Sequence, residues 1–126
     1  MSDITEKTAQ MKTAAATIQD LQTAYDQDGW KEWNKNDFEK LRHIQLHLAR
    51  TLGKFATVCH NLDHVSNEGK VVDFSSDKDA SNIVADLIHH ASQIASIYGL
   101  EIGDCVINRY KENAARFCPE SDFAKL

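Results

Sequence analysis

The scarcity of helix-breaking residues constrains the fold of this chain more than any other feature. Its 126 residues include one proline and five glycines. Between these breaks, apolar residues recur every three or four positions, which is the pattern of a helix with one buried face. No segment shows a strong strand pattern, and no internal repeat is visible. The sequence therefore predicts an all-α protein.

The first two helices are predicted from their apolar periodicity and from one start signal. Asn36, followed three residues later by Glu39, resembles a capping box and places the start of the second helix, which continues to about Val65. The first helix is predicted over about 3–27. Its expected buried stripe consists of Ile4, Met11, Ala14, Ile18, Leu21 and Tyr25.

Two further helices follow a loop that holds a short candidate extended piece at 71–74. The third is predicted over about 78–98, with Gly99 at the position of a C-terminal glycine. The fourth is predicted over about 102–117, because Pro119 cannot continue a helix. Each stripe must be buried against another element, so the expected fold is a four-helix bundle in one domain, 1–126.

Composition limits the classes of function. Hydrophobic and charged contents of 42% and 26% are typical of a soluble globular domain, and the net charge of −5 opposes nucleic-acid binding. No apolar run reaches the length of a membrane span, and the N-terminus lacks signal-peptide features. We therefore expect a cytoplasmic protein without a membrane partner. Its three cysteines, Cys59, Cys105 and Cys118, are expected to be free thiols.

The segment "NIVADLIHHASQIASIYGLEIGDCVINRYKENAARF" resembles the C-terminal half of the MazG-like, all-α NTP pyrophosphohydrolases. The second helix adds "RTLGKFA", which aligns on Gly53 and Ala56 with the family's Glu-Glu-x-Gly-Glu-Leu-Ala. The resemblance covers about 38–117 and leaves 118–126 as a short tail. The matching positions in the longer segment are Asp86, Gly99, Leu100, Asn113, Arg116 and Phe117.

The resemblance implies hydrolysis of an NTP to NMP and pyrophosphate with Mg²⁺ held by four acidic side chains on two facing helices. At those positions this chain has Thr51, Lys54, Ile83 and Asp86. Mg²⁺ prefers several oxygen ligands, and a lysine ammonium would repel it. The sequence therefore predicts a divergent member in which this hydrolysis is weak or lost.

A replacement for the metal site is suggested by the same alignment. Facing residues of antiparallel helices have residue numbers with a constant total, which pairs Thr51 with Asp86 and also pairs His47 with His90. Our hypothesis is an ion pair between Lys54 and Asp86, flanked by the two imidazoles. A zinc or iron site built from His47, His90 and Asp86 is the alternative, since imidazole and carboxylate suit these metals. Satisfied structural histidines are a third interpretation.

Five further side chains are candidates for contacts with a nucleotide or another phosphorylated small molecule. Trp30 and Trp33 in "DGWKEW" resemble an aromatic segment that stacks on the base in some family members, although packing is the alternative role. Arg109, Asn113 and Arg116 share one helix face, which by resemblance contacts the triphosphate. A solvated face paired with nearby carboxylates is the alternative.

Three functions therefore stay open at this point. The first is a divergent MazG-like protein that binds a nucleotide or a phosphorylated ligand. The second is a non-enzymatic helical module for self-association or partner binding. The third is a histidine-based transition-metal bundle of the haemerythrin or DinB type. The resemblance and the long apolar stripes also predict a homodimer or homotetramer.

Overall fold

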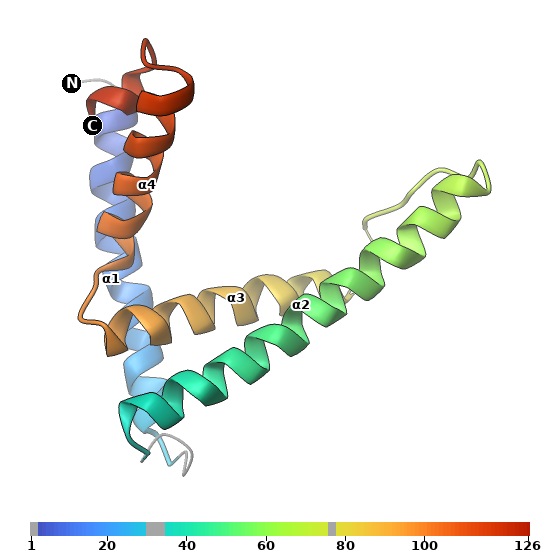
Figure 1. The fold of residues 1–126 in the computed structure, drawn as a ribbon, viewed down its shortest axis with the longest axis horizontal. Coiled ribbons are helices and arrows are strands. Elements are labelled where there is room, and N and C mark those ends of the chain that lie inside the picture. Colours follow the sequence, from blue (N-terminus) through green and yellow to red (C-terminus); the bar gives the residue numbers. More distant parts are fainter. Residues whose placement is uncertain (1–2, 30–34, 76–77) are drawn as a thin grey trace. The chain divides into compact units, whose positions relative to one another are not determined.

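A computed structural model describes residues 3–29, 35–75 and 78–126 of the chain. These residues form α1 (Asp3–Gln27), α2 (Asp37–Asn67), α3 (Lys78–Ile97), α4 (Ile102–Phe117) and the short 3₁₀ helix η2 (Asp122–Lys125) (Figure 1). The predicted all-α class with four long helices is confirmed for this part of the chain. The candidate extended piece at 71–74 forms no strand, and η2 was not predicted.

Local sequence signals account for the helix ends. The Asn36 side chain accepts a hydrogen bond of 2.9 Å from the Glu39 amide, as expected of an N-cap. Gly99 has φ +65°, and the Leu100 amide donates to the Ala95 carbonyl at 2.8 Å. This is the Schellman arrangement, in which a left-handed residue ends the helix, so glycine suits the position.

The described residues divide into two compact units, each of which is described by itself. The first unit joins α1 to Ser92–Leu126, and α4 lies alongside α1 within it (Figure 1). The second unit is Lys35–Ala91, which holds α2 and most of α3. Among the described helices, none has the length and apolar content that crossing a membrane requires.

The inward face of α1 differs from the predicted stripe. Ala15, Gln22 and Asp26 are buried, whereas Ala14, Ile18 and Leu21 are exposed, so the prediction was wrong from Ala14 onward. Tyr25, the last residue of the predicted stripe, is exposed as well. The reason is that the buried polar groups satisfy one another: Gln22 Nε2 donates to Asp26 Oδ1 at 2.9 Å. A second bond to the same oxygen comes from Gln93 Nε2 at 3.0 Å. Hydrogen bonding of this kind removes most of the cost of burying polar atoms.

The second unit buries little apolar surface. Among its described residues, 35–75 and 78–91, the buried side chains are Ile44, Thr51 and Ile83. The apolar residues that recur at helical spacing along α2 and α3 remain largely exposed. Leu52 and Phe55 on α2 and Val84 and Leu87 on α3 are examples.

Candidate functional site

The predicted site lies within the second unit, on α2 and α3. Of the four positions where the MazG-like family carries carboxylates, Thr51 and Ile83 are only 4% and 5% exposed. Asp86 is half-buried and Lys54 is exposed. The two most enclosed positions therefore hold a hydroxyl and an alkyl group.

The imidazoles of His47 and His90 lie opposite each other, as the pairing of residue numbers predicted. Their ring centroids are 6.2 Å apart, and the ring centroid of His43 lies 4.3 Å from that of His47. Partial burial lowers the pKa of His47 below 6.5, and the neighbouring His43, His90 and Arg50 lower it further, whereas Asp86 acts in the opposite direction. The cluster thus favours a neutral His47 in an environment rich in groups that can carry positive charge.

The predicted ion pair between Lys54 and Asp86 is not formed. The two residues share no contact within ion-pair distance, and Lys54 extends into solvent. Lys54 is three residues beyond the buried Thr51, which is 60° short of a full helical turn. At that angle the flexible four-carbon side chain of Lys54 places its ammonium in water instead of between α2 and α3.

The metal-site predictions were tested against the side chains as they lie. Within residues 3–29, 35–75 and 78–126, no group of three or more histidine, cysteine, aspartate or glutamate side chains could hold a metal ion. The predicted zinc or iron site of His47, His90 and Asp86 is therefore not assembled. Mg²⁺ does not fit the family positions either, because they offer a single carboxylate.

The predicted ligand-contacting residues lie elsewhere. Trp30 and Trp33 are outside the described residues. Arg109, Asn113 and Arg116 are exposed on α4, in the first unit. Arg109 pairs with Glu112 at 3.3 Å, and the Arg116 guanidinium lies 4.9 Å from the centre of the Phe117 ring. The local contacts of the two arginines are those of a solvated helix face.

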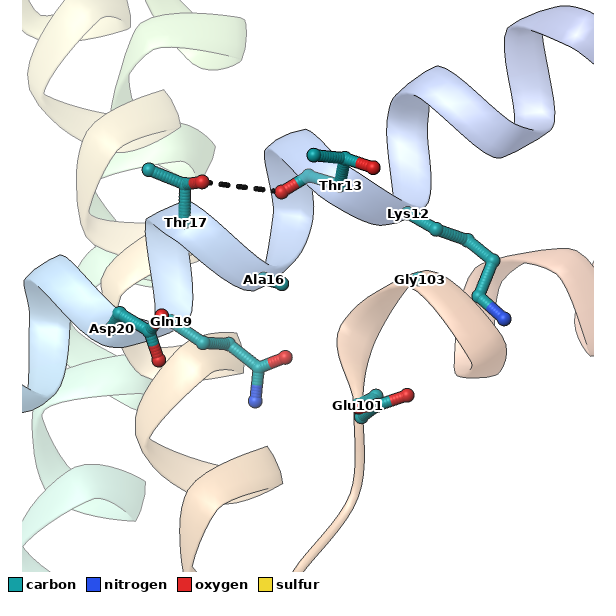
Figure 2. A pocket seen from close by; sticks show the side chains of 8 residues that line it. All are labelled: Lys12, Thr13, Ala16, Thr17, Gln19, Asp20, Glu101 and Gly103. Carbon is teal, nitrogen blue, oxygen red and sulfur yellow. Dashed lines mark hydrogen bonds between the residues drawn. The ribbon is translucent and has the colours of Figure 1, made fainter.

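A groove of about 400 Å³ in the first unit was not predicted from the sequence. Figure 2 shows its lining, which comes from α1 and from the start of α4. Gln19 is its central polar residue: Nε2 donates to the Leu100 carbonyl at 3.0 Å, and Oε1 accepts from the Ile102 amide at 2.8 Å. The N-cap residue Glu101 makes no side-chain cap bond, so Gln19 caps α4 from another helix. One feature of the sequence hinted at this arrangement: Glu101 occupies the N-cap position, where Ser, Thr, Asp or Asn is preferred.

The charges of this groove do not favour a phosphate. Its lining includes Asp20 and Glu101, and the Lys12 ammonium already contacts Asp104 at 2.8 Å. The hydrogen bond from Lys12 lowers the pKa of Asp104, while the same contact with Asp104 raises that of Lys12. We conclude that the groove is a structural junction between α1 and α4.

Comparison of the chain with protein-family models, with characterised proteins and with solved structures gives no match.

Proposed function

We propose that the chain is a divergent MazG-like protein that keeps the helical scaffold, has lost Mg²⁺-dependent NTP pyrophosphohydrolysis, and acts in the cytoplasm as a homo-oligomer. The resemblance over 38–117 supports the scaffold. The pairing of His47 with His90 supports the antiparallel register that the alignment assumes. Thr51, Lys54 and Ile83 support the loss of hydrolysis, since none carries the negative charge that a carboxylate offers Mg²⁺.

The observation that carries the proposal is the exposed apolar surface of the second unit. Leu52 and Phe55 on α2 are 54% and 52% exposed, and Val84 on α3 is 58% exposed. Leu87 lies three residues from Val84 and so shares its face. Burial of apolar surface stabilises by roughly 25 cal/mol per Å², so covering these exposed side chains would be favourable. A partner surface is therefore expected over α2 and α3.

A second copy is the partner that these residues favour. A two-fold axis would bring the same apolar residues together from both copies, because an isologous interface is self-complementary. The competing arrangement, in which the exposed α1 stripe of the same chain supplies the cover, predicts a monomer instead.

Replacing exposed apolar residues of α2 and α3 with glutamate tests the proposal. We expect Leu52→Glu and Val84→Glu each to shift the protein from oligomer toward monomer in sedimentation velocity, because each would bury an unpaired carboxylate at the interface. Thr57→Glu is the matched control, since this exposed residue of α2 lies about 140° around the helix from Leu52. Circular dichroism establishes that each variant keeps its helices. If the Leu52→Glu and Val84→Glu proteins are folded and as oligomeric as the control, the proposal is contradicted.

A second candidate function is binding of a phosphorylated small molecule at the imidazole cluster. The observation that favours it is the concentration of cationic or protonatable groups around His47, namely His43, His90 and Arg50. A phosphate would be attracted by these groups and would favour their protonated forms. Calorimetric titration with pyrophosphate and with a dNTP should show binding that strengthens from about pH 7.5 to about pH 6. Binding that is equal in Arg50→Gln, or absent at both pH values, would contradict this candidate.

A further inference from the structure

The last turns of α2 hold a second histidine pair that the proposed function does not use. His60 and His64 are one helical turn apart, and both are exposed. Their Nε2 atoms lie 3.1 Å from each other, with ring centroids 4.5 Å apart and ring planes at 83°. The two rings therefore direct the same nitrogen toward one point at the helix surface.

This separation matches two imidazoles on one metal ion. With metal–nitrogen bonds of about 2.0–2.1 Å, cis ligands at 90° would have nitrogens about 2.9 Å apart, and tetrahedral ligands about 3.4 Å apart. The observed 3.1 Å lies between these values. In the metal-free chain the contact is a hydrogen bond from one ring to the other. Metal binding requires both Nε2 lone pairs, so the donating ring moves its proton to Nδ1.

We propose that His60 and His64 bind one borderline divalent transition-metal ion, such as Zn²⁺ or Ni²⁺. Imidazole is a preferred ligand of both metals. The protein supplies two ligands, and water or small anions complete the coordination shell, because no larger group of ligating side chains occurs in the described residues. The bound ion bridges one turn of α2 and so stabilises its C-terminal end.

The other histidine pair of α2 provides the contrast. His43 and His47 have the same spacing, with ring centroids 4.3 Å apart. Their surroundings differ, since His90 and Arg50 act on His47 and would oppose a cation, while the carboxylate of Asp86 acts in the opposite direction with a smaller effect than either. Asp63 belongs to the same turn of α2 as His60 and His64, and its negative charge favours a bound cation. The same helix therefore contains a pair suited to a metal ion and a matched pair that is not.

Calorimetric titration with ZnCl₂ and NiCl₂ tests the proposal. The full chain should carry no affinity tag and should have Cys59, Cys105 and Cys118 changed to serine, because all three thiols are free and exposed. We expect one ion per chain at about pH 7.5, with binding largely lost at about pH 5, where protons compete for the imidazoles. Saturating Zn²⁺ should raise the melting temperature, since the ion binds the folded helix in preference to the unfolded chain.

Single substitutions then assign the ligands. His60→Gln and His64→Gln should each weaken Zn²⁺ binding at least about tenfold, because the second ligand of a chelating pair acts at high effective concentration. The double variant should be little worse than either single variant, and His47→Gln should change the affinity less than about twofold. Loss of binding in His47→Gln, unchanged binding in His64→Gln, or no binding up to about 1 mM metal would overturn the proposal.

Discussion

Gly103 packs tightly against α1, and replacing it with alanine probes that packing directly. A Cβ atom at this position would stand 2.9 Å from Lys12 Cα, with Lys12 Cγ and Cβ at 3.1 and 3.3 Å. The nearest atom belongs to the backbone, so no side-chain rotation relieves the contact. The two helices must instead move apart, which also disturbs the contact between Lys12 and Asp104.

The expected size follows from two opposing effects. Alanine is favoured over glycine within a helix by about 1 kcal/mol. Inserting a methyl group into a close contact typically costs about 1–3 kcal/mol, and a rigid backbone neighbour places this case near the upper end. We therefore expect Gly103→Ala to lower the free energy of unfolding by about 1–2 kcal/mol.

Gly53 offers a matched control for this substitution. It lies inside α2, and a Cβ atom there would meet nothing within 4 Å. Gly53→Ala should raise the free energy of unfolding by about 0.5–1 kcal/mol, because alanine reduces the entropy lost on folding. Urea unfolding at one fixed protein concentration measures both variants. Equal stabilities, or a Gly103→Ala protein more stable than Gly53→Ala, would refute the close contact between α1 and α4.

Three further predictions concern the α4 cap, the imidazole cluster and the lost hydrolysis. Gln19→Ala should lower the free energy of unfolding by about 1 kcal/mol because it removes the cap of α4, whereas Gln10→Ala, at an exposed position of the same helix, should have little effect in the same urea assay. The pKa of His47 is lowered by folding, so the unfolded chain binds a proton at this residue more readily than the folded chain. The contribution of His47 to stability is therefore complete above pH 6.5 and is lost as the pH falls. In urea unfolding, the free energy of unfolding of His47→Gln should decline less between about pH 7 and pH 5 than that of the unmodified protein. Pyrophosphate release from a panel of NTPs and dNTPs with Mg²⁺ or Mn²⁺ should stay far below the enzyme median of about 10 s⁻¹, and turnover near that value would show that the α2 alignment is wrong.

Local signals made the helix boundaries predictable. Asn36 and Gly99 act within a few residues of the ends that they define, and Pro119 excludes continuation of α4. The inward face of α1 was harder to predict from the sequence, because the burial of Asp26 depends on Gln93, which lies 67 residues away in the chain. Apolar periodicity alone placed Leu21 inside instead.

The candidate site was predictable only as far as helix geometry determines it. The constant total of facing residue numbers brought His47 opposite His90. The same rule failed for the ion pair between Lys54 and Asp86, since the long side chain of Lys54 can reach water from its position on α2 without any change in the backbone. The role of Gln19 as a cap from another helix could not be predicted, because its partners Leu100 and Ile102 are far from it in the sequence.

The molecular mass of the unmodified protein in solution tests the central claim most directly. Sedimentation equilibrium from about 1 to about 50 μM would measure it across the usual range of subunit concentrations. We expect a dimer or tetramer at the upper concentrations, and little dissociation in about 1 M salt, because an apolar interface is not screened by ions. A single 14.2 kDa chain at every concentration would contradict it.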